Sequence, residues 1–183
     1  MHYPLIERKP ISNIPEIDLN DINALVFTSQ FAVDIFTDFY GVIKNKIIYA
    51  IGPKTKERLI KRGYNNIILP EKFDSFSLVN LLDSSLKILY PCSSLSNNDI
   101  TNLENVIKFP VYETIFKEQK RVRLEDFDGI YFASSSCVIA FLNIYKKIPE
   151  HFIIYTGGRT TFKKLMDYGY KERSIILEKS TFD

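Results

Sequence analysis

The chain has 183 residues and a formal net charge of +2, and 45% of its residues are hydrophobic. This length allows one large domain or two small ones, and the nearly balanced charge disfavours nucleic-acid binding as the main role. No stretch approaches the ~18 apolar residues of a membrane span, and the N-terminus lacks the pattern of a secretion signal, so we expect a cytoplasmic protein that binds no membrane.

The residue types that hold metals or act as imidazole catalysts are scarce, with 2 Cys and 2 His. Cys92 and Cys137 match no metal-ligand spacing and are expected to be free thiols in the packed interior. Because only His2 and His151 supply imidazoles, a zinc site or a histidine-based nucleophile is disfavoured, and we expect neither a metal nor a cofactor.

Short apolar runs alternate with helical patterns along the chain, as in parallel α/β proteins. One helix is predicted to begin near Gln30, with Thr28 or Ser29 as its cap. Two more helices are predicted over Ser75–Asp83 and Asn98–Asn105. The predicted strands, in chain order, are Ala24–Thr28, Ile47–Ile51, Ile67–Pro70, Lys87–Pro91, Ile130–Ala133, Ile153–Thr156 and Ile175–Leu177.

An internal repeat relates the two halves of the chain. Leu25-Val-Phe-Thr-Ser29 recurs 105 residues later as Ile130-Tyr-Phe-Ala-Ser134. Gly52-Pro-Lys-Thr55, followed by Gly63-Tyr64, recurs 106 residues later as Gly158-Arg-Thr-Thr161, followed by Gly169-Tyr170. The glycines of the two Gly-Tyr pairs lie where helix C-termini need a left-handed residue. Two copies of one unit indicate two similar lobes.

The two predicted lobes are joined by a predicted two-stranded linker. Apolar alternation in Val111–Ile115 predicts a strand that pairs with Pro4–Ile11, and the charged residues up to Arg123 are expected to be solvated. We therefore divide the chain into a linker strand with its approach (1–20), a first α/β lobe (21–108), a return linker (109–123) and a second α/β lobe (124–183).

Four predicted strand ends carry hydroxyls or glycine at the start of a helix. In an open parallel sheet such ends face the crevice where ligands bind, and each helix start offers unpaired amide donors. Amides and hydroxyls together suit carboxylate or phosphate oxygens, so the pattern predicts an anion clamp shared by the two lobes. The residues are Thr28, Ser29, Gly52, Thr55, Ser134, Ser136, Gly158 and Thr161, with Lys54, Lys56, Arg58 and Arg159 close by.

Plainer interpretations of the same residues stay open. Ser and Thr cap helices for structural reasons alone. The basic residues of Lys54–Arg62 are also what an exposed helix face carries. The glycines match neither a Walker loop nor a GxGxxG fingerprint. Recurrence of the same turn chemistry in both halves favours a functional role, but it does not name the ligand.

Seven short blocks follow one another in a recognisable order. They are Ala24-Leu-Val-Phe-Thr-Ser-Gln-Phe-Ala-Val33, Ile48-Tyr-Ala-Ile-Gly-Pro-Lys-Thr55, Ser75-Phe-Ser-Leu78, Leu89-Tyr-Pro-Cys-Ser93, Val111-Tyr-Glu-Thr114, Tyr131-Phe-Ala-Ser-Ser-Ser136 and Thr156-Gly-Gly-Arg-Thr-Thr161. Each block is short and degenerate, but their order and spacing, over roughly residues 4 to 183, resemble the uroporphyrinogen-III synthase family.

The resemblance implies a fold and a reaction. The fold is α/β, with two flavodoxin-like lobes that each hold a parallel sheet and are joined by a two-stranded linker. The reaction is the cofactor-free cyclisation of hydroxymethylbilane, with inversion of ring D, to uroporphyrinogen III in haem synthesis. The partner is therefore a linear tetrapyrrole with eight carboxylates, with hydroxymethylbilane synthase as a transient contact.

The resemblance also implies site residues. Tyr112 is the candidate for assisting departure of the substrate hydroxyl, since a phenol can donate a proton or hydrogen bond. The alternative for Tyr112 is a linker-strand residue with its ring on the lobe interface. The implied substrate-binding residues are Thr28, Ser29, Gly52, Lys54, Thr55, Ser75, Ser93, Ser134, Ser136, Gly158, Arg159, Thr160 and Thr161.

The chain departs from the family pattern at both ends. The strand and helix that precede the Pro4-Leu-Ile segment in the family are missing, and Ser180-Thr-Phe-Asp183 resembles the start of a final helix. We therefore expect an incomplete second lobe with exposed apolar faces. Ser93-Ser-Leu-Ser-Asn97 also lacks the glycine and basic residues that often follow that strand. The alternative to an active synthase is a catalytically inactive or fragmentary homologue that acts as a binding module for an anionic small molecule.

Overall fold

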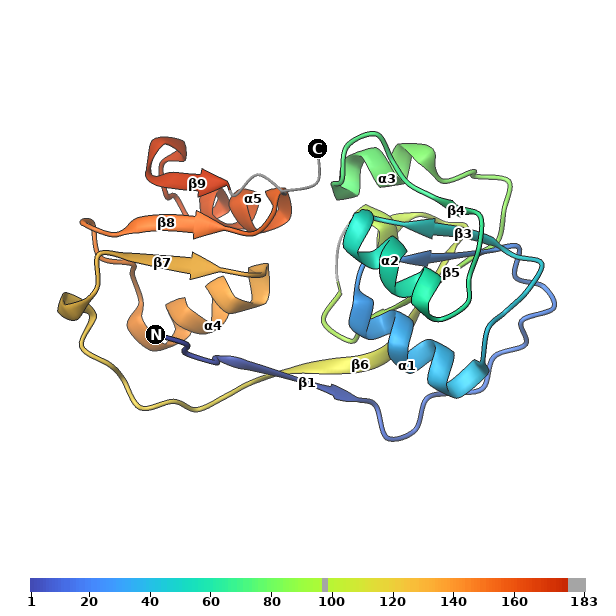
Figure 1. Ribbon diagram of the computed structural model, residues 1–183, viewed down its shortest axis with the longest axis horizontal. Coiled ribbons are helices and arrows are strands. Elements are labelled where there is room, and N and C mark those ends of the chain that lie inside the picture. Colours follow the sequence, from blue (N-terminus) through green and yellow to red (C-terminus); the bar gives the residue numbers. More distant parts are fainter. Residues whose placement is uncertain (97–98, 178–183) are drawn as a thin grey trace. The chain divides into compact units, whose positions relative to one another are not determined.

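The chain packs into two units. The computed structural model describes residues 1–96 and 99–177 (Figure 1). We call Arg8–Thr114 the central unit, and Met1–Glu7 with Ile115–Asp183 the terminal unit. The terminal unit is thus built from both ends of the chain, whereas the central unit is one continuous stretch.

A mainly parallel sheet forms the middle of the central unit. Its strands are β1 (Ile6–Pro10), β2 (Ala24–Phe27), β3 (Ile47–Ala50), β4 (Ile67–Ile68), β5 (Ile88–Ser93) and β6 (Val106–Phe116). Among the described residues they lie in the order β1-β6-β5-β2-β3-β4. β2 pairs in parallel with both β3 and β5, which places it in the centre of the sheet.

Helices cover both faces of this sheet. Leu25 and Phe27 of β2 pack in one hydrophobic cluster with α1 (Gln30–Tyr40) and α2 (Pro53–Lys61). Ala24 and Val26 pack in another with α3 (Ser75–Leu81). Successive side chains of a strand point to opposite faces, so burial of all four shows that neither face is open at β2.

The strands β1 and β6 each continue from one unit into the other. The amide of Ile11 donates to the carbonyl of Val111 at 3.1 Å, and the amide of Lys117 donates to the carbonyl of Leu5 at 2.9 Å. A step forward along β1 is therefore a step backward along β6, which makes the two strands antiparallel. The predicted two-stranded linker is confirmed. β6 also reaches further back than predicted and pairs in parallel with β5.

The terminal unit repeats the central arrangement on a smaller scale. Its elements are β7 (Gly129–Phe132), α4 (Ser135–Tyr145), β8 (Ile153–Thr156), α5 (Arg159–Asp167) and β9 (Ile175–Leu177). The described strands form a parallel sheet in the order β7-β8-β9. Phe132, Ile154 and Ile175 pack together with residues of α4 and α5 in one cluster, so the helices cover one face of the sheet.

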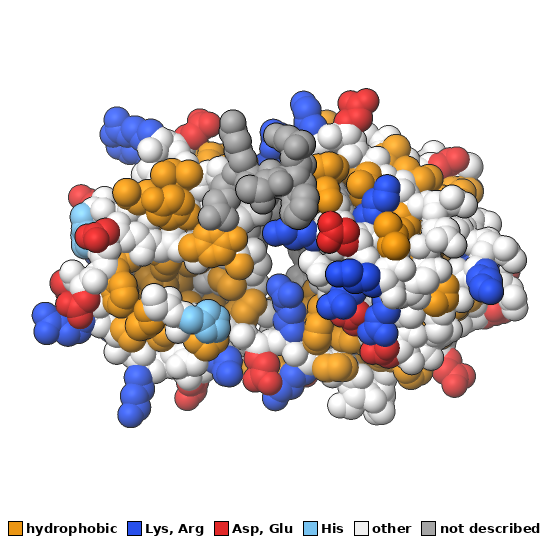
Figure 2. All heavy atoms as spheres, viewed as in Figure 1, with side chains coloured by type: hydrophobic (Ala, Val, Ile, Leu, Met, Phe, Trp, Pro, Cys, Tyr) orange, Lys and Arg blue, Asp and Glu red, His pale blue; other side chains and the backbone are white. Residues whose placement is uncertain are grey.

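The other face of the terminal sheet is open in the described part of the chain. Tyr131, Ile153 and Ile176 point away from the buried cluster and are exposed. Tyr131, Ile153 and Tyr155 line a hollow of about 350 Å³, and Figure 2 shows hydrophobic side chains gathered over this part of the unit. The expectation of an exposed apolar face in the second lobe is confirmed.

The repeated Gly-Tyr pairs end α2 and α5 in the same way. Gly63 has φ +95° and Gly169 has φ +86°. The amides of Tyr64 and Tyr170 donate back to the carbonyls of Leu59 and Leu165, 3.0 Å and 3.1 Å away. A left-handed residue followed by this long backward bond is the Schellman ending. The predicted C-terminal role of both glycines is confirmed.

Replacing Gly63 by alanine is expected to lower the free energy of unfolding by about 1 kcal/mol, because alanine is strained at a left-handed φ. Urea denaturation of the purified variant measures this loss. Gly158→Ala is the matched control, since Gly158 is extended and an added Cβ meets nothing within 4 Å. Equal losses in the two variants would show that backbone conformation is not the cause.

The helix predicted over Asn98–Asn105 is wrong. The structure has only a 3-10 turn at Asp99–Asn102, and the first residue of the predicted helix lies outside the described part. The side-chain amide of Asn105 donates to the carbonyls of Asp83 and Leu86, 3.1 Å and 2.8 Å away. These long-range bonds hold Asn105 beside the segment that leads into β5, directly before β6 begins at Val106, so the chain continues there as a strand and not as a helix.

Two further expectations concern the ends of elements. The predicted helix Ser75–Asp83 ends at Leu81, and the helix start at Ser180-Thr-Phe-Asp183 lies outside the described residues. Across the described residues, no helix has the length and apolarity that would let it cross a membrane.

Candidate functional site

The carboxyl ends of the parallel strands lie together at one side of the central unit, which we call the carboxyl edge (Figure 1). Because β2 lies between β5 and β3, the turns that follow these three strands are neighbours. Tyr112 in β6 is the register partner of Ser93 at the end of β5. The structure thus brings the following predicted site residues to one edge: Thr28, Ser29, Gly52, Lys54, Thr55, Ser93 and Tyr112.

The turn between β2 and α1 starts a helix without a side-chain cap. Ser29 is the N-cap residue in extended conformation, and among the described residues no side chain accepts from the first-turn amides. Thr28 does not cap the helix either, because its hydroxyl shares a 2.8 Å hydrogen bond with the hydroxyl of buried Tyr90. The first-turn amides therefore keep their capacity to donate to a ligand oxygen.

The turn between β3 and α2 has the same property for a different reason. Its N-cap is Gly52, which has no side chain, and Pro53 at the first helical position has no N–H. The amides of Lys54 and Thr55 are the donors that remain. Thr55 itself is buried, whereas the Lys54 side chain is exposed. This turn offers backbone amides and one cation.

The ends of β5 and β6 supply hydroxyls and the predicted tyrosine. The hydroxyl of Ser93 lies 3.4 Å from that of Thr114. Tyr112 is buried, and its ring meets the ring of Phe31 edge-on, with centroids 5.1 Å apart. The amide of Ser94 donates to the carbonyl of Tyr112 at 2.8 Å. Tyr112 is therefore fixed in the core of the central unit, where its ring has little freedom.

The start of α3 offers less to an anion than the other turns. Its N-cap is Asp74, whose carboxylate accepts from the amide of Ser77 at 2.8 Å. Ser75 is the first helical residue and is half-buried. A carboxylate already satisfies part of this helix end, and it repels a second carboxylate.

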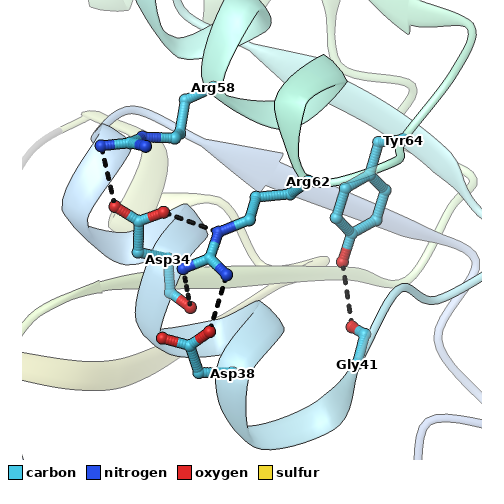
Figure 3. A network of polar contacts seen from close by, with 6 residues as sticks. All are labelled: Asp34, Asp38, Gly41, Arg58, Arg62 and Tyr64. Atoms are coloured by element: carbon cyan, nitrogen blue, oxygen red, sulfur yellow. Dashed lines mark hydrogen bonds and ion pairs between the residues drawn. The ribbon is translucent and has the colours of Figure 1, made fainter.

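The basic residues of α2 meet acidic residues of α1 (Figure 3). Arg58 pairs with Asp34 at 3.3 Å, and Arg62 pairs with Asp34 at 2.8 Å and with Asp38 at 2.7 Å. These hydrogen bonds raise the pKa of Arg62. Arg58, expected to face an anionic ligand, is thus partly neutralised by Asp34. Arg58 and Arg62 therefore fit the plainer interpretation of Lys54–Arg62, in which the basic residues belong to an ordinary helix face.

Sequence reasoning missed this network, although a signal was present. Asp34 and Asp38 are four residues apart, and so are Arg58 and Arg62. Two acids and two bases with that spacing each form one helical stripe. The repeat gave no hint that the two helices are adjacent.

The turn between β7 and α4 holds a small group of side-chain oxygens. Ser134 is the N-cap, and its hydroxyl lies 2.9 Å from the hydroxyl of Ser136 and 3.3 Å from the thiol of Cys137. Ser135, which sequence reasoning passed over, donates to the carbonyl of Thr160 at 3.2 Å. Ser135 therefore ties this turn to the start of α5.

The start of α5 repeats the start of α2. Gly158 is the N-cap in extended conformation, and in the part of the chain described here no side chain caps its amides. Arg159 and Thr160 are exposed, whereas Thr161 is buried like Thr55. Just before them, Thr156 is fully buried, and its hydroxyl has no hydrogen-bond partner among the described residues.

The glycine before this turn lies close to the end of the Tyr131 side chain. A Cβ added to Gly157 would meet the hydroxyl of Tyr131. Sequence reasoning placed Gly157 in a family block without giving it or Thr156 a role.

Side chains that could bind a metal do not cluster in the described part of the chain. Within residues 1–96 and 99–177, no three His, Cys, Asp or Glu side chains gather closely enough to hold an ion. Cys92 is buried, and burial raises the pKa of its thiol.

The fold and these turns define a class of protein: two α/β units built on parallel strands, in which the helices α1, α2, α4 and α5 begin without a side-chain cap from their N-cap residue. A family model described as "Uroporphyrinogen-III synthase HemD" matches residues 1–182. The chain belongs to the uroporphyrinogen-III synthase family.

Solved structures of the family share the fold. The uroporphyrinogen-III synthetase of Helicobacter pylori has a TM-score of 0.60 and 21% identity, with 96% of this chain and 84% of that chain covered. A mutant uroporphyrinogen III synthase of Thermus thermophilus has a TM-score of 0.63 and 13% identity, with 97% and 82% covered. The wild-type form of that enzyme has a TM-score of 0.54 and 15% identity, with 93% and 82% covered. No curated protein matches the chain.

Proposed function

We propose that the chain is an active uroporphyrinogen-III synthase, a lyase of tetrapyrrole synthesis that closes hydroxymethylbilane to uroporphyrinogen III with inversion of ring D. One observation carries the proposal. In a chain that belongs to this family, both units present helix N-termini without side-chain caps where parallel strands end. Eight carboxylates on one substrate are the chemistry that such donors bind.

The proposed binding residues fall into two groups by the atoms they offer. Backbone amides come from the turns that start at Ser29, Gly52, Ser134 and Gly158. Charges and hydroxyls come from the side chains of Thr28, Ser29, Lys54, Ser75, Ser136, Arg159 and Thr160. Ser93 is buried, and its hydroxyl accepts from the amide of Leu95, so we assign it to support of the turn after β5. Thr55 and Thr161 are buried beneath their turns, so we assign them to support of the helix start.

The proposed chemistry consists of the loss of water, proton transfers and carbon–carbon bond changes, with no net oxidation or reduction, so it calls for no redox cofactor. The C–O bond to the terminal hydroxyl breaks, the hydroxyl takes a proton, and water leaves. The resulting azafulvene cation is attacked by the substituted carbon of ring D, giving a spiro intermediate. That intermediate rearranges with ring D inverted and loses a proton. Tyr112 would donate a hydrogen bond or proton to the departing hydroxyl.

Positioning accounts for most of the expected catalysis. The cation must meet the substituted carbon of ring D, so the substrate has to be held in one geometry. Amides and hydroxyls fixed at strand ends supply that geometry without reorganisation. The uncatalysed closure competes, so we also propose that hydroxymethylbilane synthase hands over its product in a transient contact.

A coupled assay tests the proposal. Hydroxymethylbilane is generated freshly by its own synthase, the purified chain is added, and the products are oxidised and separated as type I and type III porphyrins. We expect the type III isomer in excess over the control without the chain. Type I alone, from protein shown to be folded, would contradict the proposal and favour a binding module instead.

A further inference from the structure

Large hydrophobic side chains are exposed at the carboxyl edge of the central unit. Phe76 is 71% exposed, Leu95 58% and Phe73 46%. Among the described residues, only Met1 exceeds Phe76 and Leu95 in exposure of a large hydrophobic side chain. We call Phe73, Phe76 and Leu95 the apolar rim.

The apolar rim lies beside the turns already described. The Cβ of Phe73 is 3.3 Å from the place that a Cβ on Gly52 would occupy, so Phe73 contacts the start of α2. Leu95 is in the turn that follows β5, where its amide donates to the hydroxyl of Ser93 at 3.3 Å. Phe76 is in the first turn of α3, three residues beyond Phe73.

The strand order places the apolar rim on both sides of the anion-binding turns. The strands β5, β2, β3 and β4 are consecutive neighbours. Leu95 follows β5 and Phe73 follows β4, while the turns at Ser29 and Gly52 lie between them. At about 4.8 Å between strands, β5 and β4 are about 14 Å apart, which is the size of a molecule with several pyrrole rings.

Exposure of these side chains stabilises nothing in the folded chain. Burying the exposed part of a Phe or Leu side chain against a ligand would contribute a favourable hydrophobic free energy. Folding leaves this stabilisation unused at three positions on one edge. A ligand with flat apolar rings would recover it on binding, whereas a ligand with carboxylates alone would not.

We propose that the apolar rim binds the pyrrole rings of the tetrapyrrole, while the amides and hydroxyls between Leu95 and Phe73 bind its carboxylates. This inference rests on the proposed function and names a hydrophobic part of the same site. It makes Phe76 and Leu95 residues that determine specificity for ring-bearing polycarboxylates.

Two measurements test the apolar rim. In the coupled assay, Phe76→Ala and Leu95→Ala are each expected to raise KM about 5- to 10-fold with kcat nearly unchanged, since truncation removes uniform binding. In direct titration, the fluorescence of uroporphyrin I, a stable ring with eight carboxylates, is expected to show a similar loss of affinity. Phe39→Ala is the matched control, because Phe39 is 51% exposed but lies near the far end of α1.

The outcomes separate this inference from the proposed function. If the parent chain makes only type I product, the proposed synthase activity is contradicted. The titration with uroporphyrin I still decides whether the apolar rim binds a ring-bearing ligand. If the parent fails to bind uroporphyrin I, or if Phe76→Ala and Leu95→Ala bind it as tightly as Phe39→Ala, the apolar rim does not contact the ligand. Urea denaturation of all three variants establishes that each one is folded.

Discussion

Phenylalanine in place of Tyr112 is expected to lower the rate of uroporphyrinogen III formation about 100-fold, which is the lower end of what a positioned proton donor contributes. KM should stay close to that of the parent, because the ring keeps its edge contact with Phe31 and only the hydroxyl is lost. Initial rates of type III product over a range of hydroxymethylbilane concentrations separate the two constants. A fall in kcat alone identifies an interaction made in the transition state.

The control for this variant is Tyr40→Phe. The hydroxyl of Tyr40 donates to the carbonyl of Pro15 at 2.8 Å, and its ring packs with Phe36 in the same cluster as Tyr112. It therefore tests loss of a phenol hydroxyl from the same core without removing one from the carboxyl edge. If Tyr112→Phe keeps the rate of the parent, Tyr112 is a packing residue and the hydroxyl leaves without its help.

Alanine in place of Phe27 is expected to lower the free energy of unfolding by about 3–5 kcal/mol, the usual cost of deleting a buried aromatic ring. Phe27 is fully buried, and its ring meets Phe36 and Tyr64 at centroid distances of 5.7 Å and 6.4 Å. It also immediately precedes Thr28 and Ser29, so the cavity would loosen the turn that starts α1. Urea denaturation followed by circular dichroism measures the loss.

Two comparisons sharpen this prediction. Phe132 takes the same place in the terminal repeat, is buried, and meets Phe141 edge-on at 5.6 Å, so Phe132→Ala should also cost several kcal/mol. Phe39→Ala should cost less than about 1 kcal/mol, because half of that side chain is already in water. A Phe27 variant as stable as the Phe39 variant would mean that the cluster repacks around the missing ring.

Much of the fold could be predicted because local and repeated signals agree. The apolar run in Ala24–Phe27 and the two Gly-Tyr pairs each specify a local conformation, and their recurrence specifies two units. The structure confirms the parallel sheets, the left-handed glycines and the antiparallel linker strands. Each of these features depends on residues that are close in sequence or that repeat.

The features that escaped prediction depend on long-range neighbours. The side chain of Asn105 stops a helix by bonding to carbonyls about twenty residues away. Asp34 forms an ion pair with Arg58 because α1 and α2 lie side by side on one face of the sheet. No periodicity along the chain encodes either contact.

The candidate site could be predicted in position but not in accessibility. The turns of Ser29 and Gly52 and the end of β5 meet at one edge because their strands are neighbours, as the α/β pattern implied. Sequence reasoning did not foresee that Thr55 and Thr161 are buried or that Thr28 bonds Tyr90. It also passed over Phe76 and Leu95, since single exposed apolar residues leave no pattern in a sequence.

The terminal unit is built from two segments that are far apart in the sequence, and this fixes the order in which the two units can fold during translation. Tyr3 donates to the carbonyl of Lys120, 117 residues further along the chain, and Leu5 is buried in the core of the terminal unit. The central unit, by contrast, is complete in Arg8–Thr114. As the chain leaves the ribosome, all residues of the central unit are available before Ile115–Asp183 are synthesised. Met1–Glu7 can pack only after those later residues have emerged. Met1–Glu7 are therefore synthesised before the central unit but reach their place after it.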